Sequence, residues 1–367
     1  MLRPPIVLLA LLLCPLVRGG LAQPVKVRAP DGVLTGTVRD SVSGLPIGYA
    51  LVILGERGQR VFASESGRFT LAGLASGSVT LRVQQIGYRA VTLSVSLDAS
   101  PGSPTGAPGL VVRLTRQVVV LPEIVVEGDV CSGVRERSAD LTDGILGEMF
   151  KNAERLLALQ EDYPFQETYQ EATALFDSLG GVTGGRVDTG RYDSRRILRY
   201  RRGRVIEMEG PARLESARYF QPSDLAREEF RRTHCFWYAG LDTLDGYRAF
   251  LIQFAPLREV KSADWAGSLL IDSASMVLER SEAHLVNIPR RGTFLSASCT
   301  LLYRQVFPTL VTLQQARCVS RLRGKPPTTT VARWQLIDFK FLLRTPSEVE
   351  PAKPAPPLLP HFRRTTR

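Results

Sequence analysis

Apolar and polar residues alternate along two stretches near the start of the chain. Residues 78–85 and 89–97 place an apolar side chain at every second position, as with Val79, Leu81 and Val83. A period of two with one apolar face predicts half-buried antiparallel strands. Shorter strands with glycine-containing turns between them are predicted at residues 34–39, 49–54, 60–63 and 68–71. About seven short strands at this spacing predict a β-sandwich of two sheets.

Residues 138–160 change to a helical period. The apolar positions are Leu141, Ile145, Met149, Ala153, Leu156 and Leu157. This spacing predicts one amphipathic helix. Its apolar face is expected to pack in a core, and a groove for a partner is the alternative.

The chain beyond the helix is again rich in strand patterns. Strands are predicted at residues 165–176, 197–208, 230–240, 247–256, 267–271, 277–286, 293–306, 310–322 and 330–343. The connections are short, so successive strands are expected to be antiparallel neighbours in a meander. The predicted fold class is mainly β: an N-terminal seven-stranded β-sandwich, followed by a C-terminal antiparallel β-meander or half-barrel that wraps one amphipathic helix.

The first 22 residues have the pattern of a secretory signal. Arg3 precedes an apolar run at residues 6–17, and small residues lie at Gly20 and Ala22. A membrane anchor is the alternative, but the run is shorter than the roughly 20 residues that span a bilayer. Lipidation at Cys14 is a second alternative, although leucines precede it. We therefore expect an exported protein, in the periplasm or associated with the outer membrane.

Four segments follow from these patterns. They are a signal peptide at 1–22, a sandwich at 31–128, a β-rich domain with an N-terminal helix at 138–345, and a proline-rich tail at 346–367 that is expected to be disordered.

The chain is basic, with a formal net charge of +11. An exported basic protein is drawn to anionic surfaces such as phospholipid or lipopolysaccharide, and nucleic acid is not expected as a partner. Arginines are concentrated at Arg186, Arg191, Arg195, Arg196, Arg199, Arg201, Arg202 and Arg204. Six of them, from Arg195 to Arg204, are candidates for contact with an anionic surface, because the guanidinium group suits phosphates. A solvated edge strand protected by charge is the alternative.

Four cysteines follow the signal segment: Cys131, Cys235, Cys299 and Cys318. An even number in an exported chain favours disulfides. Cys299 and Cys318 are equally far from a turn at residues 308–309, so a hairpin there would place them opposite each other. By elimination Cys131 would then pair with Cys235. Four buried free thiols are the alternative, and the spacing does not suit zinc.

Several motifs of the first domain together resemble a known family. They are Gly36-Thr-Val-Arg-Asp40, Gly44-Leu-Pro-Ile47, Ala50-Leu-Val-Ile53, Ser66-Gly-Arg-Phe69 and Ile86-Gly-Tyr88. The set resembles the carboxypeptidase regulatory-like domain, a transthyretin-like sandwich grouped with carbohydrate-binding-like folds. The resemblance implies a non-catalytic module that often precedes TonB-dependent receptors, and residues 121–128 are similar to the linker found there. The chain departs from this family by an insertion at 99–109, and it is too short afterwards for a transporter barrel.

The second domain resembles a different group. Residues 250–256, 267–272 and 277–280 follow an order of apolar strand, turn and strand that is similar to the half-barrel of LolA-like lipoprotein carriers and related periplasmic sensors. The resemblance implies a sheet that cups an apolar ligand such as an acyl chain. The alternative is that the helix fills the concave face as core.

The sequence offers no recognisable catalytic constellation. The three histidines, His234, His284 and His361, lack the acidic spacing of a zinc enzyme, and neither a Gly-x-Ser-x-Gly motif nor a phosphate loop is present. No cofactor or metal is therefore expected. The leading hypothesis is a non-catalytic envelope protein that binds carbohydrate or an envelope protein through its sandwich. The first alternative is a lipid or lipoprotein carrier or sensor, and the second is a glycan or peptide hydrolase whose carboxylates meet only in space.

Overall fold

The computed structural model describes residues 25–28, 33–55, 58–75, 77–98, 109–117, 144–196, 199–209, 214–244, 246–307, 310–324, 326–343 and 346. The signal segment 1–22, residues 99–108 of the insertion, the motif at 121–128, Cys131 and the tail after residue 346 lie outside these described residues. The predictions of export, lipidation and a disordered tail therefore stay predictions.

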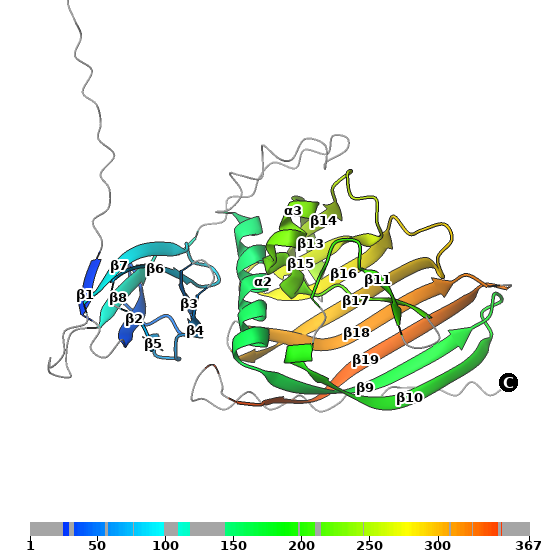
Figure 1. Ribbon diagram of the computed structural model, residues 1–367, viewed down its shortest axis with the longest axis horizontal. Coiled ribbons are helices and arrows are strands. Elements are labelled where there is room, and N and C mark those ends of the chain that lie inside the picture. The colour runs from blue at the N-terminus through cyan, green and yellow to red at the C-terminus, as the bar shows by residue number, and fades with distance from the viewer. Residues whose placement is uncertain are drawn as a thin grey trace, which may run out of the picture.

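The N-terminal domain is a β-sandwich, as predicted, but its described residues form eight strands and not seven, because Val25–Arg28, before the predicted start at residue 31, adds a strand (Figure 1). One sheet has the order β1-β7-β6-β3-β4, with β1 Val25–Arg28, β7 Val91–Asp98, β6 Gly77–Gln84, β3 Leu51–Leu54 and β4 Arg60–Phe62. The other has the order β5-β2-β8, with β5 Arg68–Leu71, β2 Leu34–Asp40 and β8 Leu110–Leu114. Every second residue of β2 and β8 is buried, so the alternation in the sequence does mark the inner face.

The turn before β5 depends on glycine. Gly67 has a φ of +72°, and a Cβ atom there would lie 2.6 Å from the backbone oxygen of Val38. Only glycine avoids both the strain and the close contact. This accounts for the Ser66-Gly67 signal in the sequence.

The C-terminal domain is built on one nine-stranded antiparallel sheet. Its order is β10-β9-β19-β18-β17-β16-β15-β14-β13. The bounds are β9 Phe165–Phe176, β10 Val182–Asp193, β13 His234–Leu244, β14 Tyr247–Pro256, β15 Asp264–Asp272, β16 Leu278–Val286, β17 Phe294–Phe307, β18 Leu310–Leu322 and β19 Thr328–Phe341. Strands β13 to β19 form the predicted meander. Strand β9 then pairs with β19 at its far side, from Phe165 opposite Phe341 to Phe176 opposite Thr329.

Two strand predictions in this domain were wrong. The described residues of 197–208 do not form one strand: residues 199–205, after the 3₁₀ helix Ser194–Arg196, are irregular, and they lead to a small hairpin of β11 (Ile206–Glu209) and β12 (Leu214–Ala217). The long strand is instead β10, whose side chains are mostly exposed. Strand β10 contains glycines and has no buried face, so its sequence shows no apolar alternation from which it could be predicted.

The predicted strand at residues 230–240 also begins too early. Residues Glu228–Thr233 form the short helix α3, and β13 starts at His234. Two acidic residues at its start and two arginines at its end suit the helix dipole. A 3₁₀ helix, η4 (Pro222–Ala226), precedes it.

The helix α2, Ile145–Asp162, lies between the two domains (Figure 1). Its apolar side chains, such as Met149 and Ala153, pack in the core of the large sheet, as predicted. Its opposite side carries Glu148, Lys151 and Arg155, and these are buried too. We call the sheet face that α2 covers the inner face. An amphipathic pattern predicts that the polar side of a helix is solvated. The burial of the side of α2 that carries Glu148, Lys151 and Arg155 therefore shows that a second body packs against it.

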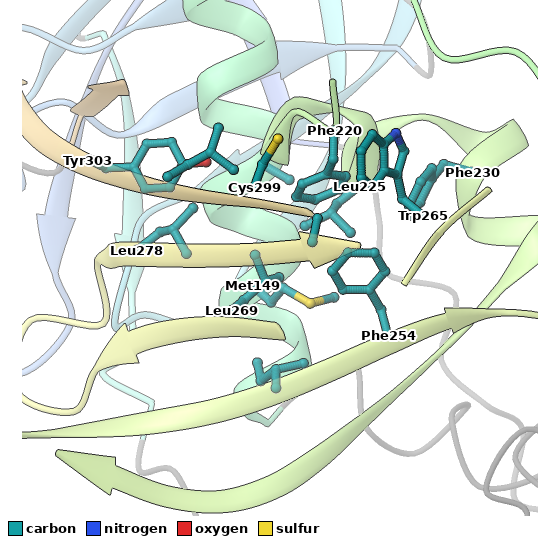
Figure 2. Packing of buried hydrophobic residues seen from close by; sticks show 14 of the residues in the cluster. Met149, Phe220, Leu225, Phe230, Phe254, Trp265, Leu269, Leu278, Cys299 and Tyr303 are labelled. Carbon is teal, nitrogen blue, oxygen red and sulfur yellow. The ribbon is translucent and has the colours of Figure 1, made fainter. Parts of the chain in front are cut away.

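Most of the inner face is filled core (Figure 2). Met149 of α2, Leu225 of η4 and Phe230 of α3 pack over Phe254 and Trp265 of the sheet. Phe220 stacks on Phe254 with ring centroids 4.9 Å apart. This part of the structure agrees with the expectation that the helix fills the concave face.

The predicted Cys299–Cys318 disulfide is present, and the two residues face each other in the register of β17 and β18. Cys235 is also disulfide-bonded, and Cys131 lies outside the described residues. Its pairing with Cys131 therefore stays a prediction. Of the helices in the described part of the chain, none combines the length and apolar character needed to cross a bilayer.

Candidate functional site

A pocket of about 160 Å³ remains at one end of the inner face. It lies between the C-terminal half of α2, the chain around η4 and five neighbouring strands at one end of the large sheet, β10, β9, β19, β18 and β17. The lining residues are Leu156, Gln160, Phe165, Glu167, Tyr169, Tyr192, Tyr219, Phe220, Gln221, Pro222, Leu301, Tyr303, Thr312, Leu313, Ala316, Cys318 and Trp334. Aromatic side chains dominate this set, and Glu167 is its one acidic member.

The period of strand β9 places three side chains in the pocket. Phe165, Glu167 and Tyr169 are buried, while the residues between them are less so. Alternate residues of a strand point to the same face, so the carboxyl group is carried inward with the two rings. The sequence pattern predicted this strand, but it did not mark Glu167 as unusual.

Glu167 is only 7% exposed. Its Oε1 atom accepts a hydrogen bond from the hydroxyl of Thr312, on strand β18. Burial raises the pKa of Glu167 to about 7, against the opposing effects of hydrogen bonds from Thr312 and Tyr169 and the charge of Arg304. Near neutral pH this carboxyl group therefore exists in both its protonated and its ionised form.

The tyrosines of the pocket are held by hydrogen bonds at their hydroxyl groups. Tyr169 donates to the backbone oxygen of Leu313 at 3.1 Å, and Tyr303 lies 2.8 Å from the hydroxyl of Ser281. Burial raises the pKa of both tyrosines, so they stay neutral. Fixed hydroxyl groups keep the ring faces in place around the cavity.

Two edge-to-face ring pairs stand near the opening of the pocket. The Tyr169 and Tyr192 centroids are 5.5 Å apart, and those of Tyr219 and Trp334 are 5.1 Å apart. Tyr192 and Tyr219 are each 43% exposed, so the pocket meets solvent beside them. Tyr192 also donates a hydrogen bond to Glu171, and burial raises its pKa to about 12.

The disulfide forms part of the pocket wall. Cys318 lines the cavity, and its bond to Cys299 joins β18 to β17. A covalent link across these two strands fixes the wall on which Thr312 and Ala316 stand. The sequence predicted the disulfide but gave no sign that it borders a cavity.

A second set of buried contacts fixes the sandwich to α2. The Nζ atom of Lys151 donates to the backbone oxygens of Tyr88 and Gln85 at 2.6 and 3.3 Å, and lies 2.5 Å from Glu148. The other carboxylate oxygen of Glu148 accepts from the backbone N–H of Gly87 at 3.1 Å. Burial raises the pKa of Glu148 and lowers that of Lys151, and their mutual attraction opposes both shifts. A buried pair with its remaining atoms hydrogen-bonded joins two surfaces in one orientation.

An apolar cluster continues the same interface. Tyr49, Leu51 and Phe62 of the sandwich share a cluster with Leu159 and Phe165 of the second domain. The interface also includes the hydroxyl of Tyr163, which accepts from the N–H of Phe62 at 3.1 Å. The sandwich therefore packs against the second domain of the same chain, through one edge of its larger sheet.

An open cleft of about 1220 Å³ borders this interface. Its arginines share two glutamates: Glu161 contacts Arg60, Arg199 and Arg227 at 2.9, 3.5 and 3.2 Å. Glu154 similarly contacts two further arginines. The charges in the cleft are largely paired within the protein.

The six arginines predicted to meet an anionic surface are all exposed. Arg195 pairs with Asp193 at 2.6 Å, and Arg199 pairs with Glu161 in the cleft. The other four are Arg196, Arg201, Arg202 and Arg204. Arg186 and Arg191 lie on β10, which is an edge strand of the sheet. The alternative of a charged edge strand fits those two residues, and contact with an anionic surface stays a prediction.

One buried polar cluster was not expected from the sequence. His234 lies 3.5 Å from Asp264, and the hydroxyl of Tyr200 donates to Asp264 at 2.6 Å. The histidine ring stacks on Phe230 with centroids 3.7 Å apart. Neither His234 nor Asp264 lines the pocket or the cleft. Within the described ranges, no group of three or more His, Cys, Asp and Glu side chains is arranged to hold a metal.

Comparison with known proteins identifies the sandwich. Residues 33–108 match the carboxypeptidase regulatory-like domain, as the sequence motifs predicted. A search of curated proteins gives no match.

Three of the solved structures similar to this chain each cover about half of it. A DUF1329 family protein from Desulfovibrio piger is 10% identical, with a TM-score of 0.30 over 54% of this chain and 93% of that one. A putative outer membrane lipoprotein-sorting protein domain from Vibrio parahaemolyticus is 13% identical, with a TM-score of 0.27 over 52% and 94%. A LolA superfamily protein from Nitrosomonas europaea is 13% identical, with a TM-score of 0.26 over 53% and 94%. At TM-scores of this size the likeness assigns no function.

Proposed function

We propose that this chain is a non-catalytic binding protein of the cell envelope, and that its ligand site is the aromatic pocket of the second domain. The observation that carries the proposal is the pocket itself. It is a part of the inner face where α2 and the η4 segment leave space over the sheet, while the part of that face around Phe254 and Trp265 is packed core. Concave, mostly apolar sites with a few polar groups are where proteins bind small ligands.

The size of the pocket limits the ligand. A cavity of about 150 Å³ lined by apolar side chains takes up benzene. The 160 Å³ found here therefore suits one aromatic ring or the end of an alkyl chain. A carrier of a whole lipid needs more space, so the carrier hypothesis requires that only part of the lipid enters.

The sandwich has a different role in this proposal. It packs on α2 through the Glu148–Lys151 pair and the cluster around Phe62. The aromatic residues described in this domain, Tyr49, Phe62, Phe69 and Tyr88, are buried or partly buried, so none of them is an exposed side chain available to a ligand. In this proposal the sandwich supports α2, the helix that covers the pocket. Carbohydrate binding by the sandwich stays a prediction.

The envelope location rests on two features of the sequence and structure. The segment 1–22 has the pattern of a secretory signal. The Cys299–Cys318 disulfide suits an oxidising compartment. Mass spectrometry of the protein from the periplasmic fraction would test both, because cleavage after residue 22 and an intact disulfide are expected together.

A titration with a neutral aromatic probe tests the binding proposal. We expect 2-phenylethanol to bind the purified protein in isothermal titration calorimetry and to change the fluorescence of Trp334. Ala316 lies in the pocket wall and is buried, so Ala316→Phe should fill the cavity and abolish binding. The matched control is Ala172→Phe, on β9 but outside the pocket, which should bind as the unaltered protein does. Binding that survives Ala316→Phe in a folded variant would overturn the proposal.

A further inference from the structure

The pocket contains one feature that a purely apolar ligand does not require. Glu167 is buried among rings, and no basic side chain lines the pocket with it; Arg304, whose charge lowers its pKa, is not among the lining residues. A buried carboxylate without a partner is costly, and protein interiors keep such groups only with a hydrogen bond, a proton or a cation. Thr312 satisfies one oxygen of Glu167, and the group still faces the cavity.

The rings around this carboxyl group favour the same kind of ligand. Tyr169, Tyr192, Tyr219 and Trp334 lie in the pocket as two edge-to-face pairs. The face of an aromatic ring attracts cations, most strongly for Trp and Tyr and more strongly when water is excluded. A carboxylate and several ring faces around one small cavity are complementary to a positive charge with an apolar body.

We propose that the pocket takes an organic cation: a primary amine on a single aromatic ring or a short alkyl chain, with its ammonium group at Glu167 and its apolar body among the rings. This inference rests on the proposed function and names the class of its ligand. The cavity volume limits the apolar body to about one ring. The ammonium group supplies the positive charge that the described lining residues of the pocket lack.

The charge of Glu167 makes this binding depend on pH. Its carboxyl group must be ionised to pair with an ammonium group, and its pKa is about 7. The buried tyrosines of the pocket, Tyr169 and Tyr303, have raised pKa values and remain neutral, and the charge of Arg304 favours the ionised form of Glu167. Protons therefore compete with the amine below pH 7, and the apparent dissociation constant should rise about 100-fold from pH 8 to pH 5.

The experiment compares two probes that share one body. Calorimetric titrations with 2-phenylethylamine and 2-phenylethanol are run at pH 5, 6, 7 and 8. We expect the amine to bind more tightly as the pH rises and the alcohol to bind equally at each pH. Glu167→Gln keeps an oxygen for Thr312 and should remove both the preference for the amine and its pH dependence. Glu282→Gln, which removes the same charge elsewhere on the sheet, is the matched control and should change neither.

The possible failures can be told apart. If the alcohol binds and the amine shows neither preference nor pH dependence, the inference about the cation is wrong and the proposed binding function stands. If neither probe binds the folded protein, the proposed function fails as well. If Glu167→Gln retains the full pH dependence, a different group is responsible and the assignment to Glu167 is wrong.

Discussion

The inner face of the large sheet has two halves with different roles. In one half, Phe254 and Trp265 are completely covered by α2, α3 and the chain around Phe220. In the other half, strands β9, β18 and β19 surround a cavity that contains Glu167. Both halves belong to the same sheet and are covered by the same helix. The comparison shows that the proposed binding site is a region of the core where packing is incomplete. The buried carboxyl group of Glu167 marks that region.

The filled half should show the largest effect on stability. Phe254→Ala removes a ring that contacts Phe220, Phe230 and Phe236. Deleting a fully buried phenylalanine typically costs about 3–5 kcal/mol because a cavity remains. We expect denaturant unfolding to show a loss of about 4 kcal/mol while 2-phenylethanol still binds to the fraction that is folded. A loss below about 1 kcal/mol would mean that this half is not core.

Glu167 should show the next largest effect, as a dependence of stability on pH. Its pKa is about 7 in the folded chain against 4.5 as the ordinary value, so between these pH values the folded state binds more protons than the unfolded state. The free energy of unfolding should then fall as the pH rises from about 4.5 to about 7, by up to about 3 kcal/mol.

Glu167→Gln should remove this part of the decline. The measurement is the difference in unfolding free energy between the two proteins from pH 4 to pH 8, because the other titrating groups cancel in that difference. We expect the variant to gain stability relative to the unaltered protein as the pH rises. A constant difference would show that the carboxyl group titrates at its ordinary pKa.

The mouth of the pocket should show the smallest effect on stability. Tyr219 is 43% exposed and packs on one side against Trp334. Exposed positions usually tolerate substitution within about 0.5 kcal/mol. We expect Tyr219→Ala to unfold at nearly the same denaturant concentration, yet to weaken the binding of 2-phenylethylamine several-fold because one ring face is lost. Unchanged affinity would place the ligand deeper, away from Tyr219.

Local patterns predicted much of the fold but little of the site. The strands with clear alternation, such as β6 and β7, lie within two residues of their predicted bounds. Strand β10 was missed because it has no buried face to impose an alternation. The site was missed because Glu167 and Thr312, which meet in the pocket, are 145 residues apart. A single acidic residue on a strand pattern is ordinary until its surroundings are known.

The sequence by itself determined the two β-rich domains, the helix between them and the partner of Cys299. Each of these follows from short-range rules: the period of apolar side chains, the turn residues, and the symmetry of a hairpin about its turn. Only the tertiary structure decided that Glu148 and Lys151 are buried under the sandwich. It alone also brought β9 beside β19. These depend on surfaces distant in the chain, where the environment of a side chain is set by what packs on it, and no local pattern records that.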